Sequence, residues 1–374
     1  MITLGKKIGI LGGGQLGRMT GQAARELSYG FAVFEPSKNC PAGQVADLEI
    51  NANYDDHAAL ERLADFSDVV TYEFENVDVS ALRKLEEHVP VYPNPDALYI
   101  CQNREREKNF LKENGFPHAP YAVVEDEAAL SAAIEKIGTP SVLKTASFGY
   151  DGKGQQKINT PKPDTAAIWK AFGGSRAVLE GWVNFEMEIS VIVAISSNGE
   201  SKVFPTSENI HTNHILDFSI VPARIAPEIA KKAEVLAREV AQKLNIVGLL
   251  GVELFVLANG EIVINELAPR PHNSGHYTMD GCVTCQFEQF TRAVCGLPLG
   301  STELLRPIVM VNILGDTWKD GEPNWAAILQ HPNAKLHLYG KAEAKPARKM
   351  GHFTVSADTI EKAFTEAQRL KDAL

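Results

Sequence analysis

The sequence predicts a three-part protein of mixed α/β and α+β class, with a parallel sheet in its N-terminal part and a small β-rich C-terminal part. Over residues 1–95, strand-like and helix-like segments alternate, which is typical of a parallel sheet covered by helices. Residues 96–296 contain long β-rich segments and one long amphipathic helix, and residues 297–374 contain a few strands and a final helix. We therefore expect three domains, over residues 1–95, 96–296 and 297–374.

The composition narrows the class of protein. The chain has 374 residues, of which 44% are hydrophobic and 22% charged, so an ordinary hydrophobic core can form. Its net charge of −10 argues against nucleic acid as the main partner. No apolar stretch reaches the roughly 20 residues of a membrane-spanning helix. We expect a cytoplasmic protein that binds small molecules, and neither nucleic acid nor membrane.

The N-terminal part is expected to alternate three strands with three helices. The strands are Lys7–Leu11, Phe31–Phe34 and Asp68–Phe74, and the helices are Gln15–Ser28, Asp55–Asp65 and Val79–Glu87. Glu73, Glu75 and Asn76 lie at the end of the third strand, where ligands dock in parallel sheets. They are candidate binding residues, and the alternative is a pair of solvated carboxylates followed by a helix cap.

A glycine-rich turn joins the first strand to the first helix. Gly12, Gly14 and Gly17 form a GxGxxG pattern, and Glu35 follows Gly14 by 21 residues. This is the context of the dinucleotide fingerprint, in which backbone amides approach a pyrophosphate. The same turn can hold the phosphate or carboxylate of another ligand, or be a tight turn alone. The central part of the chain argues against NAD, because an NAD enzyme leaves its features unexplained.

The central part begins with two expected helices, Arg104–Asn114 and Asp126–Ile137, and the strand Ser141–Thr145. A second glycine-rich loop over residues 148–154 follows, and the spacing is not that of a Walker A loop. A glycine loop with a strand lysine, here Lys144, covers triphosphates in several nucleotide-binding folds. The alternative is a hairpin turn with two solvated lysines. Further strands are expected at Ala177–Val183 and Glu186–Ser196, with a helix at Ile229–Leu244.

Two glutamates are predicted to face each other across a hairpin. Asn259-Gly260 lies between alternating apolar segments, which predicts a two-residue type I′ turn. That register pairs Glu253 with Glu266 on one face, with Cβ atoms about 5 Å apart. Facing carboxylates destabilise a sheet unless a cation bridges them, and Mg²⁺ prefers carboxylate and phosphate oxygens. The alternatives are an exposed sheet face or one protonated glutamate.

The C-terminal part is expected to contain strands at Ile308–Leu314, Lys335–Tyr339 and His352–Ser356, and a final helix at Thr359–Leu370. Lys341, Lys345, Arg348 and Lys349 lie between the last two strands. Because strand, turn and strand bring these side chains to one sheet edge, they are a candidate anion site. The alternative is a solvated basic loop.

Several of these segments resemble a known superfamily. Lys144, the loop 149–155, residues 180–183, Glu188, Glu253 and Asn265-Glu266 are similar in order to those of ATP-grasp enzymes, over residues 104–296. Residues 12–17, 71–77, 268–276 and 348–352 narrow the resemblance to the N5-carboxyaminoimidazole ribonucleotide synthetases, the bicarbonate-using ligases of purine biosynthesis. The resemblance covers nearly the whole chain. It implies an ATP-grasp domain between a Rossmann-like pre-ATP-grasp domain and a small C-terminal domain.

The resemblance also implies an activity. In that family ATP phosphorylates bicarbonate to carboxyphosphate, and the amine of 5-aminoimidazole ribonucleotide receives the carboxyl group. The implied cofactor is Mg²⁺, or Mn²⁺, on Glu253 and Glu266; no NAD is implied, and the assembly is a homodimer. The implied ATP site comprises Arg104, Lys144, Gly149, Tyr150, Asp151, Gly152, Lys153, Gly154, Gln155, Glu180, Gly181, Trp182, Val183, Glu188, His211, Asn265 and Glu266.

The chemistry of this reaction suggests roles for a few side chains. Arg270 suits a planar anion through its fork of donors, His272 could hydrogen-bond the same anion or relay a proton, and Lys153 would supply positive charge. The alternative for His272 is a satisfied loop histidine. The expected substrate-binding residues are Gly14, Gln15, Glu73, Asn76, Tyr150, Asp151, Arg270, His272, Lys341 and Arg348. Formate-dependent glycinamide ribonucleotide transformylase, another ATP-grasp ligase, is the alternative assignment.

Overall fold

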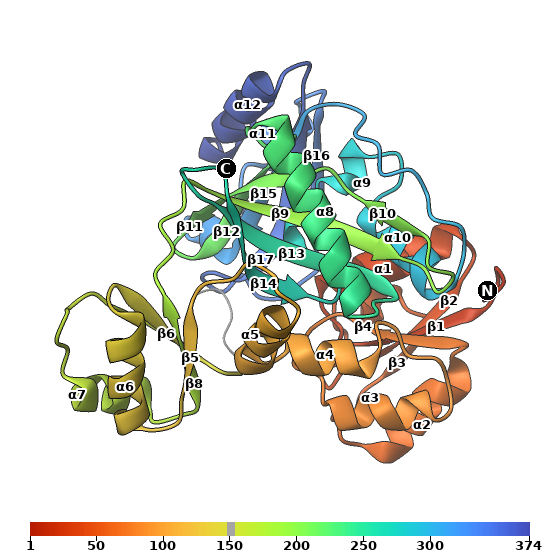
Figure 1. Ribbon diagram of the computed structural model, residues 1–374. Coiled ribbons are helices and arrows are strands. Elements are labelled where there is room, and N and C mark those ends of the chain that lie inside the picture. Colours follow the sequence, from red (N-terminus) through yellow and green to blue (C-terminus); the bar gives the residue numbers. More distant parts are fainter. Residues whose placement is uncertain (148–153) are drawn as a thin grey trace.

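The computed structural model describes residues 1–147 and 154–374 (Figure 1). Five residues expected in the ATP site, Gly149, Tyr150, Asp151, Gly152 and Lys153, lie outside the described residues. No helix among the described residues is both long enough and apolar enough to cross a membrane.

The N-terminal part is a four-stranded parallel sheet with strand order β3-β2-β1-β4. The strands are β1 (Lys7–Leu11), β2 (Gly30–Phe34), β3 (Leu48–Ile50) and β4 (Val69–Tyr72), and the helices α1 (Gln15–Glu26), α2 (His57–Phe66) and α3 (Val79–Glu86) connect or follow them. The alternation of strands and helices is as expected. The sequence analysis missed β3, which has three residues and no apolar alternation of its own.

A small antiparallel sheet follows two linking helices, α4 (Pro95–Cys101) and α5 (Arg104–Glu113). Its strand order is β5-β8-β6-β7. The strands are β5 (Tyr121–Val124), β6 (Ser141–Thr145), β7 (Gln155–Ile158) and β8 (Ala177–Gly181), with α6 (Glu127–Ile137) and α7 (Thr165–Phe172) beside them. Apolar side chains of α6 and α7 pack on the strands in one buried cluster, so this sheet has its own core.

A nine-stranded sheet forms the centre of the molecule, in the order β14-β13-β9-β11-β12-β15-β17-β16, with β10 paired to β9. Its strands are β9 (Met187–Ile195), β10 (Ser201–Val203), β11 (Ser207–Thr212), β12 (Ile215–Val221), β13 (Gly248–Val256), β14 (Ile262–Ala268), β15 (Ile308–Leu314), β16 (Ala334–Leu338) and β17 (Lys349–Ser356). The remaining helices are α8 (Pro227–Lys243), α9 (Thr278–Gly281), α10 (Gln286–Val294), α11 (Trp325–Leu329) and α12 (Ile360–Asp372). In Figure 1, α8 crosses one face of this sheet.

The C-terminal strands extend the central sheet instead of forming a separate one. β15 pairs antiparallel with β12, for example Phe218 with Val311, and β17 and β16 follow it. Sequence patterns within the C-terminal part do not reveal this pairing, because it joins strands about 90 residues apart. The boundaries near 95 and 296 stay a prediction.

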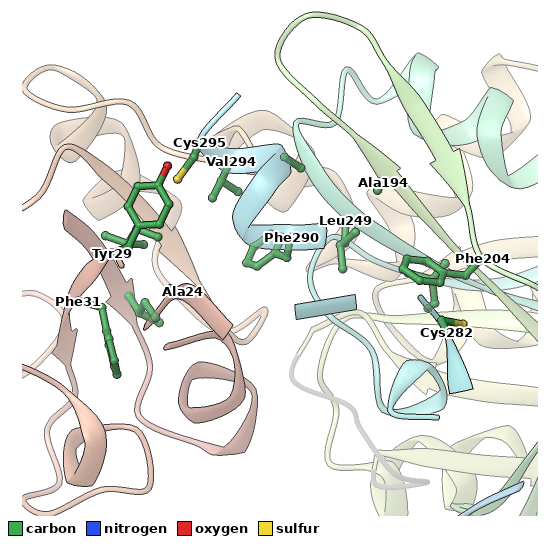
Figure 2. Packing of buried hydrophobic residues seen from close by; sticks show 14 of the residues in the cluster. Ala24, Tyr29, Phe31, Ala194, Phe204, Leu249, Cys282, Phe290, Val294 and Cys295 are labelled. Atoms are coloured by element: carbon green, nitrogen blue, oxygen red, sulfur yellow. The ribbon is translucent and has the colours of Figure 1, made fainter. Parts of the chain in front are cut away.

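The N-terminal sheet shares a hydrophobic core with the central sheet. Figure 2 shows Tyr29 of the N-terminal part near Cys295, the residue that follows α10, with Leu249 of β13 beyond Phe290. The Tyr29 hydroxyl donates to the carbonyl of Ile2, at 2.6 Å. Burial of this apolar surface fixes the N-terminal part against the central sheet, and brings the end of β4 close to the cavity described below.

The hairpin that carries the two glutamates differs from the predicted one. Gly260 has a φ of 76°, and the amide of Leu257 donates to the carbonyl of Glu261, at 2.8 Å. The loop therefore has three residues, and the predicted two-residue type I′ turn was wrong. A one-residue bulge at Asn265 shifts the register back, so Glu253 still pairs with Glu266. The predicted pairing is confirmed because these two differences cancel.

Candidate active site

A cavity of about 820 Å³ opens between the small sheet, the central sheet and the end of β4. Most of the described residues that were expected to form a site line it. These are Gln15, Glu73, Arg104, Lys144, Gly154, Gln155, Glu180, Gly181, Trp182, Val183, Glu188, His211, Glu253, Asn265, Glu266, Arg270 and His272. The structure therefore brings together side chains that are up to about 257 residues apart in sequence.

A row of polar side chains crosses the central sheet at this cavity. Glu266 of β14 pairs with Glu253 of β13, which pairs with Ser190 of β9. Residues opposite each other on antiparallel strands point to the same face. Burial opposes ionisation of Glu253, but the hydrogen bond and charge of His272 lower the pKa of Glu253 to about 2. Arg104 Nη1 lies 3.3 Å from Glu266 Oε2, so each of the two carboxylates has a side-chain nitrogen beside it.

Buried cations surround Glu180, at the end of β8. Lys144 Nζ lies 3.1 Å from one of its oxygens and Lys108 Nζ 3.4 Å from the other. Burial raises the pKa of Glu180, but these two lysines and Arg104 together bring it down to about 2. Burial lowers the pKa of Lys144 below its usual value, and Glu180 opposes this effect.

The sequence analysis missed Lys108, which is fully buried on α5. Its ammonium also donates to the carbonyl of Asn265, at 2.9 Å, and so links α5 to β14. The neighbouring Glu107 accepts from the amide of Leu267, at 2.9 Å, and burial raises its pKa to about 7. Lys108 and Glu107 precede the buried Leu111 by three and four positions. This helical spacing indicates that they lie on the buried face of α5, and it was the signal that could have identified them.

One end of the cavity has apolar and aromatic walls. The rings of Phe185 and Phe255 are stacked, with centroids 4.4 Å apart and an interplanar angle of 6°. Trp182 lies beside them in the lining, with Lys157 Nζ 3.3 Å from its ring centroid. The sequence analysis named Trp182 and missed the other three. A flat aromatic base fits such a slot better than a hydrated ion would.

Glu188 of β9 pairs with Phe255 of β13, and His211 lies on β11, which is the next strand beside β9. His211 Nδ1 is in contact with a carboxylate oxygen of Glu188. Burial alone lowers the pKa of His211, but the hydrogen bond and charge of Glu188 raise it above the usual value.

Arg270 and His272 follow β14 and line the cavity near the polar row of Glu266, Glu253 and Ser190. Arg270 forms an ion pair with Glu75, and one of its terminal nitrogens donates to the carbonyl of Pro271, at 3.1 Å. Its buried Nε–H has no partner among the described residues. His272 Nε2 lies 3.1 Å from Glu253 Oε1. The cavity wall therefore contains an arginine with a donor to spare, which is an unusual and costly state for a buried polar group.

Glu73 occupies the turn that resembled a dinucleotide site. Its carboxylate accepts the amide N–H of Gly14, and also that of Gly17 at 2.7 Å. The amide of Gly13 donates to Glu35 at 3.1 Å. Carboxylates of the chain itself thus accept from the amides of Gly13, Gly14 and Gly17 at this turn. Burial raises the pKa of Glu73, while the two amide hydrogen bonds favour its ionised form.

Four described residues that were expected to bind substrate are not in the lining of the cavity: Gly14, Asn76, Lys341 and Arg348. Asn76 is exposed. Lys341 donates to the carbonyl of Lys349 at 2.7 Å, and Arg348 donates to that of Glu343 at 3.0 Å. Their neighbour Lys349 does line the cavity, so the basic turn lies at its edge. Gln44 fixes this turn to the N-terminal part by donating to Gly340, at 2.9 Å.

Three family descriptions match successive parts of the chain. Residues 5–102 match the ribonucleotide synthetase preATP-grasp domain, residues 109–287 the ATP-grasp domain, and residues 308–366 the phosphoribosylaminoimidazole carboxylase C-terminal domain. This order agrees with the three parts of the fold. The expected ATP-grasp architecture is confirmed.

Whole-length relatives agree with these matches. The N5-carboxyaminoimidazole ribonucleotide synthase of Bacillus subtilis is 51% identical over 351 residues, which are 94% of this chain and 91% of that protein. The Brucella melitensis synthase is 47% identical over 351 residues, which are 94% of this chain and 96% of that protein. The Aspergillus clavatus synthase in complex with ADP and 5-aminoimidazole ribonucleotide has a TM-score of 0.90 at 35% identity, covering 98% of each chain. The chain belongs to the N5-carboxyaminoimidazole ribonucleotide synthase family.

Proposed function

We propose that this protein catalyses the ATP-dependent carboxylation of 5-aminoimidazole ribonucleotide with bicarbonate. The products are N5-carboxyaminoimidazole ribonucleotide, ADP and phosphate, formed through carboxyphosphate, in de novo purine (IMP) biosynthesis. The observation that carries the proposal is one cavity in which the carboxylate pair Glu253–Glu266 lies beside Arg270 and His272. Carboxylates for a cation and donors for a small anion are what the phosphorylation of bicarbonate requires.

The ATP site is proposed to lie between the small sheet and β13. The adenine would lie at the aromatic end with Trp182, Val183 and Phe255. Lys144 of β6 lines the cavity and would bind phosphate oxygens. Its partner Glu180 is shared with Lys108, so a single carboxylate faces two ammonium groups and positive charge remains for a phosphate. A solved N5-carboxyaminoimidazole ribonucleotide synthetase in complex with ADP is 51% identical to this chain with a TM-score of 0.93, and supports nucleotide binding here.

The donor set fits a hard divalent cation. Glu253 and Glu266 face each other and Glu253 is ionised, since its pKa is about 2. The described residues contain no group of three His, Cys, Asp or Glu side chains that could hold a metal, so phosphate oxygens and water would complete the shell, as Mg²⁺ prefers. Mn²⁺ takes similar oxygen ligands. When bound, the cation would neutralise charge on the phosphates.

Arg270 is proposed to hold bicarbonate and the carboxyphosphate made from it. Its ion pair with Glu75 fixes the guanidinium, and its unpartnered Nε–H supplies a donor toward an anion. His272 would donate a hydrogen bond to the same anion. Exclusion of water by the surrounding walls would protect carboxyphosphate from hydrolysis. Lys153, outside the described residues, is proposed to add positive charge.

The ribonucleotide is proposed to lie between Gln15, Glu73 and the basic turn, with its 5′-phosphate near Lys341 and Arg348. Gly14, Asn76, Tyr150 and Asp151 stay proposed substrate contacts. The glycine turn is a poorer phosphate site, because Glu73 already accepts from its amides. The same occupancy supports the prediction that the protein binds no NAD.

The setting of the reaction is part of the proposal. ATP, bicarbonate and the ribonucleotide are the proposed partners, with neither nucleic acid nor membrane, and the proposed location is the cytoplasm. We also propose a homodimer, on the family resemblance, which light scattering behind size exclusion tests directly.

A coupled assay of ADP release tests the activity. We expect turnover that requires 5-aminoimidazole ribonucleotide and bicarbonate together with Mg²⁺, and no turnover with formate and glycinamide ribonucleotide. Formate-dependent turnover with the second substrate would instead identify the protein as a transformylase. Identification of N5-carboxyaminoimidazole ribonucleotide by rapid quenching completes the test, because bicarbonate-dependent ATP hydrolysis alone would release ADP as well.

A further inference from the structure

The segment that carries Arg270 and His272 has few backbone donors of its own. Residues 269 to 272 are Pro-Arg-Pro-His, and proline has no backbone N–H. The amide of Arg270 donates close to its own position, to the carbonyl of Ala268 at 2.8 Å. The amide of His272 is therefore the backbone donor of these four residues that can join the segment to another element.

A buried glutamine accepts from that amide. Gln286 is the first residue of α10 and is fully buried. Its Oε1 accepts from the amide of His272 at 2.9 Å, and its Nε2 donates to the carbonyl of His272 at 2.9 Å. The side-chain amide thus pairs with both backbone groups of His272, as a residue of a neighbouring antiparallel strand would.

The contacts of this amide determine its orientation. A backbone N–H only donates and a backbone carbonyl only accepts, so the oxygen of Gln286 must face the amide of His272 and the nitrogen must face its carbonyl. The nitrogen has a second hydrogen, which it can donate to Nδ1 of His276, at 2.9 Å. Gln286 therefore uses its oxygen and both of its N–H groups on the loop that contains His272.

Close packing confines the same loop from two sides. A Cβ added to Gly275 would lie 2.6 Å from Gln286 Oε1, and one added to Gly251 of β13 would lie 3.0 Å from the Cβ of His272. Glycine at both positions allows this close approach. Helix α10 itself is anchored by Phe290 in the hydrophobic core, so Gln286 extends from a rigid element.

We propose that Gln286 is a positioning residue that holds the backbone of His272, and thereby places the side chains of Arg270 and His272 in the cavity. Gln286 is not among the described residues that line the cavity, so it acts through His272. A displacement of about 1 Å in groups that bind a reacting anion can lower the rate roughly a hundredfold. The catalytic part of this inference rests on the proposed function, whereas the hold on the loop does not.

Gln289 provides a matched control on the same helix. It is also fully buried, and its amide pairs with both backbone groups of Gly300, at 2.8 and 3.0 Å. Gly300 belongs to a different loop, outside the described lining of the cavity. Gln286→Met and Gln289→Met therefore remove the same kind of pairing from the same helix, but only the first releases His272.

Hydrogen exchange of the His272 amide tests the hold directly. The chain has ten histidines, so nitrogen-15 labelling of histidine amides gives few NMR signals, and His272→Gln identifies the one from His272. We expect slow exchange in the wild type and about tenfold faster exchange in Gln286→Met, the effect of losing one hydrogen bond. The amide of His352, a buried residue of β17, reports global opening and should exchange alike in Gln286→Met and Gln289→Met.

Steady-state kinetics test the catalytic part. We expect Gln286→Met to lower kcat/KM for bicarbonate roughly ten- to hundredfold, with the KM for ATP unchanged. Gln289→Met should change neither quantity. An equal loss in both variants, or a loss in Gln286→Met that affects the KM for ATP to the same degree, would indicate general destabilisation and refute a positioning role.

Fast exchange of the His272 amide in the wild type, or unchanged exchange in Gln286→Met, would overturn the proposal. If Gln286→Met does not fold, Gly275→Ala replaces it, because the added Cβ would displace the amide of Gln286, and the wild-type exchange rate still decides whether His272 is held. If the wild-type protein releases no ADP with 5-aminoimidazole ribonucleotide and bicarbonate, the proposed function fails while the exchange rates still decide the hold on the loop.

Discussion

Replacement of Lys108 by methionine should destabilise the protein by removing one cation from a buried cluster. The ammonium of Lys108 is fully buried, lies 3.4 Å from Glu180 and donates to the carbonyl of Asn265. Methionine fills a similar volume without charge. Removal of one partner from a buried ion pair costs about 3–5 kcal/mol, because the other charge stays buried. Lys144 and Arg104 remain near Glu180, so the lower end of that range is expected.

The pH dependence of this loss provides a second, independent check. The pKa of Glu180 is lowered from 4.5 to about 2 in the folded protein, a difference worth about 3 kcal/mol. A lowered folded-state pKa adds stability that is fully present above pH 4.5 and is lost as the pH falls toward 2. Without Lys108 the pKa of Glu180 rises, so less stability depends on its ionisation. The difference in unfolding free energy between variant and wild type should therefore be constant from about pH 6 to about pH 5 and narrow below it. Above about pH 7 it should widen, because Lys108 also lowers the pKa of Glu107.

Thermal unfolding followed by tryptophan fluorescence measures both effects, with Lys112→Met as the control. Lys112 lies one turn further along α5 and is exposed, so its loss should cost under about 1 kcal/mol. We expect Lys108→Met to melt several degrees below Lys112→Met. Equal melting temperatures, or a gap that does not depend on pH, would refute the argument that Lys108 stabilises an ionised Glu180.

Three further experiments test the site. Glu266→Gln should keep the fold and abolish Mg²⁺-dependent ADP formation, and near wild-type turnover would exclude Glu266 as a ligand. Arg348→Ala should raise the KM for the ribonucleotide about ten- to a hundredfold, since a charge-assisted contact contributes roughly 1.5–3 kcal/mol. The KM for ATP should not change. An unchanged ribonucleotide KM in both Arg348→Ala and Lys341→Ala would place the phosphate elsewhere. Fluorescence titration with NADH should show no saturable micromolar binding, because Glu73 fills the glycine turn, and saturation would contradict that reasoning.

Local patterns were sufficient to predict most of the elements and much of the site. β1, β6 and β15 have the predicted bounds, because each is a short apolar segment between clear breaks. The pairing of Glu253 with Glu266 followed from register, since side chains alternate with a period of two. The loop type was wrong because Asn-Gly is also compatible with a three-residue turn, in which only Gly260 needs a positive φ.

The features that the sequence analysis missed depend on contacts between distant segments. The pairing of β15 with β12 joins residues about 90 positions apart. The hydrogen bond from Lys108 to Asn265 of β14 joins residues 157 positions apart. No local period reports such pairings. Phe185 and Phe255 are each ordinary aromatic residues in a β-rich segment, and only the adjacency of β9 and β13 stacks them.

The first glycine turn shows how a correct motif can have an occupant other than a cofactor. β1 and β4 are adjacent parallel strands, so the turn after β1 and the residue after β4 meet at the same sheet edge. Glu73 is the residue after β4, and its carboxylate accepts from the amides that would otherwise bind a pyrophosphate. The N-terminal part therefore presents a wall to the cavity that includes Gln15 and Glu73, and the amides of Gly14 and Gly17 already have a carboxylate partner. An anionic substrate must then obtain its positive partners from the other two parts, which is where Arg270, Lys144 and Lys349 lie.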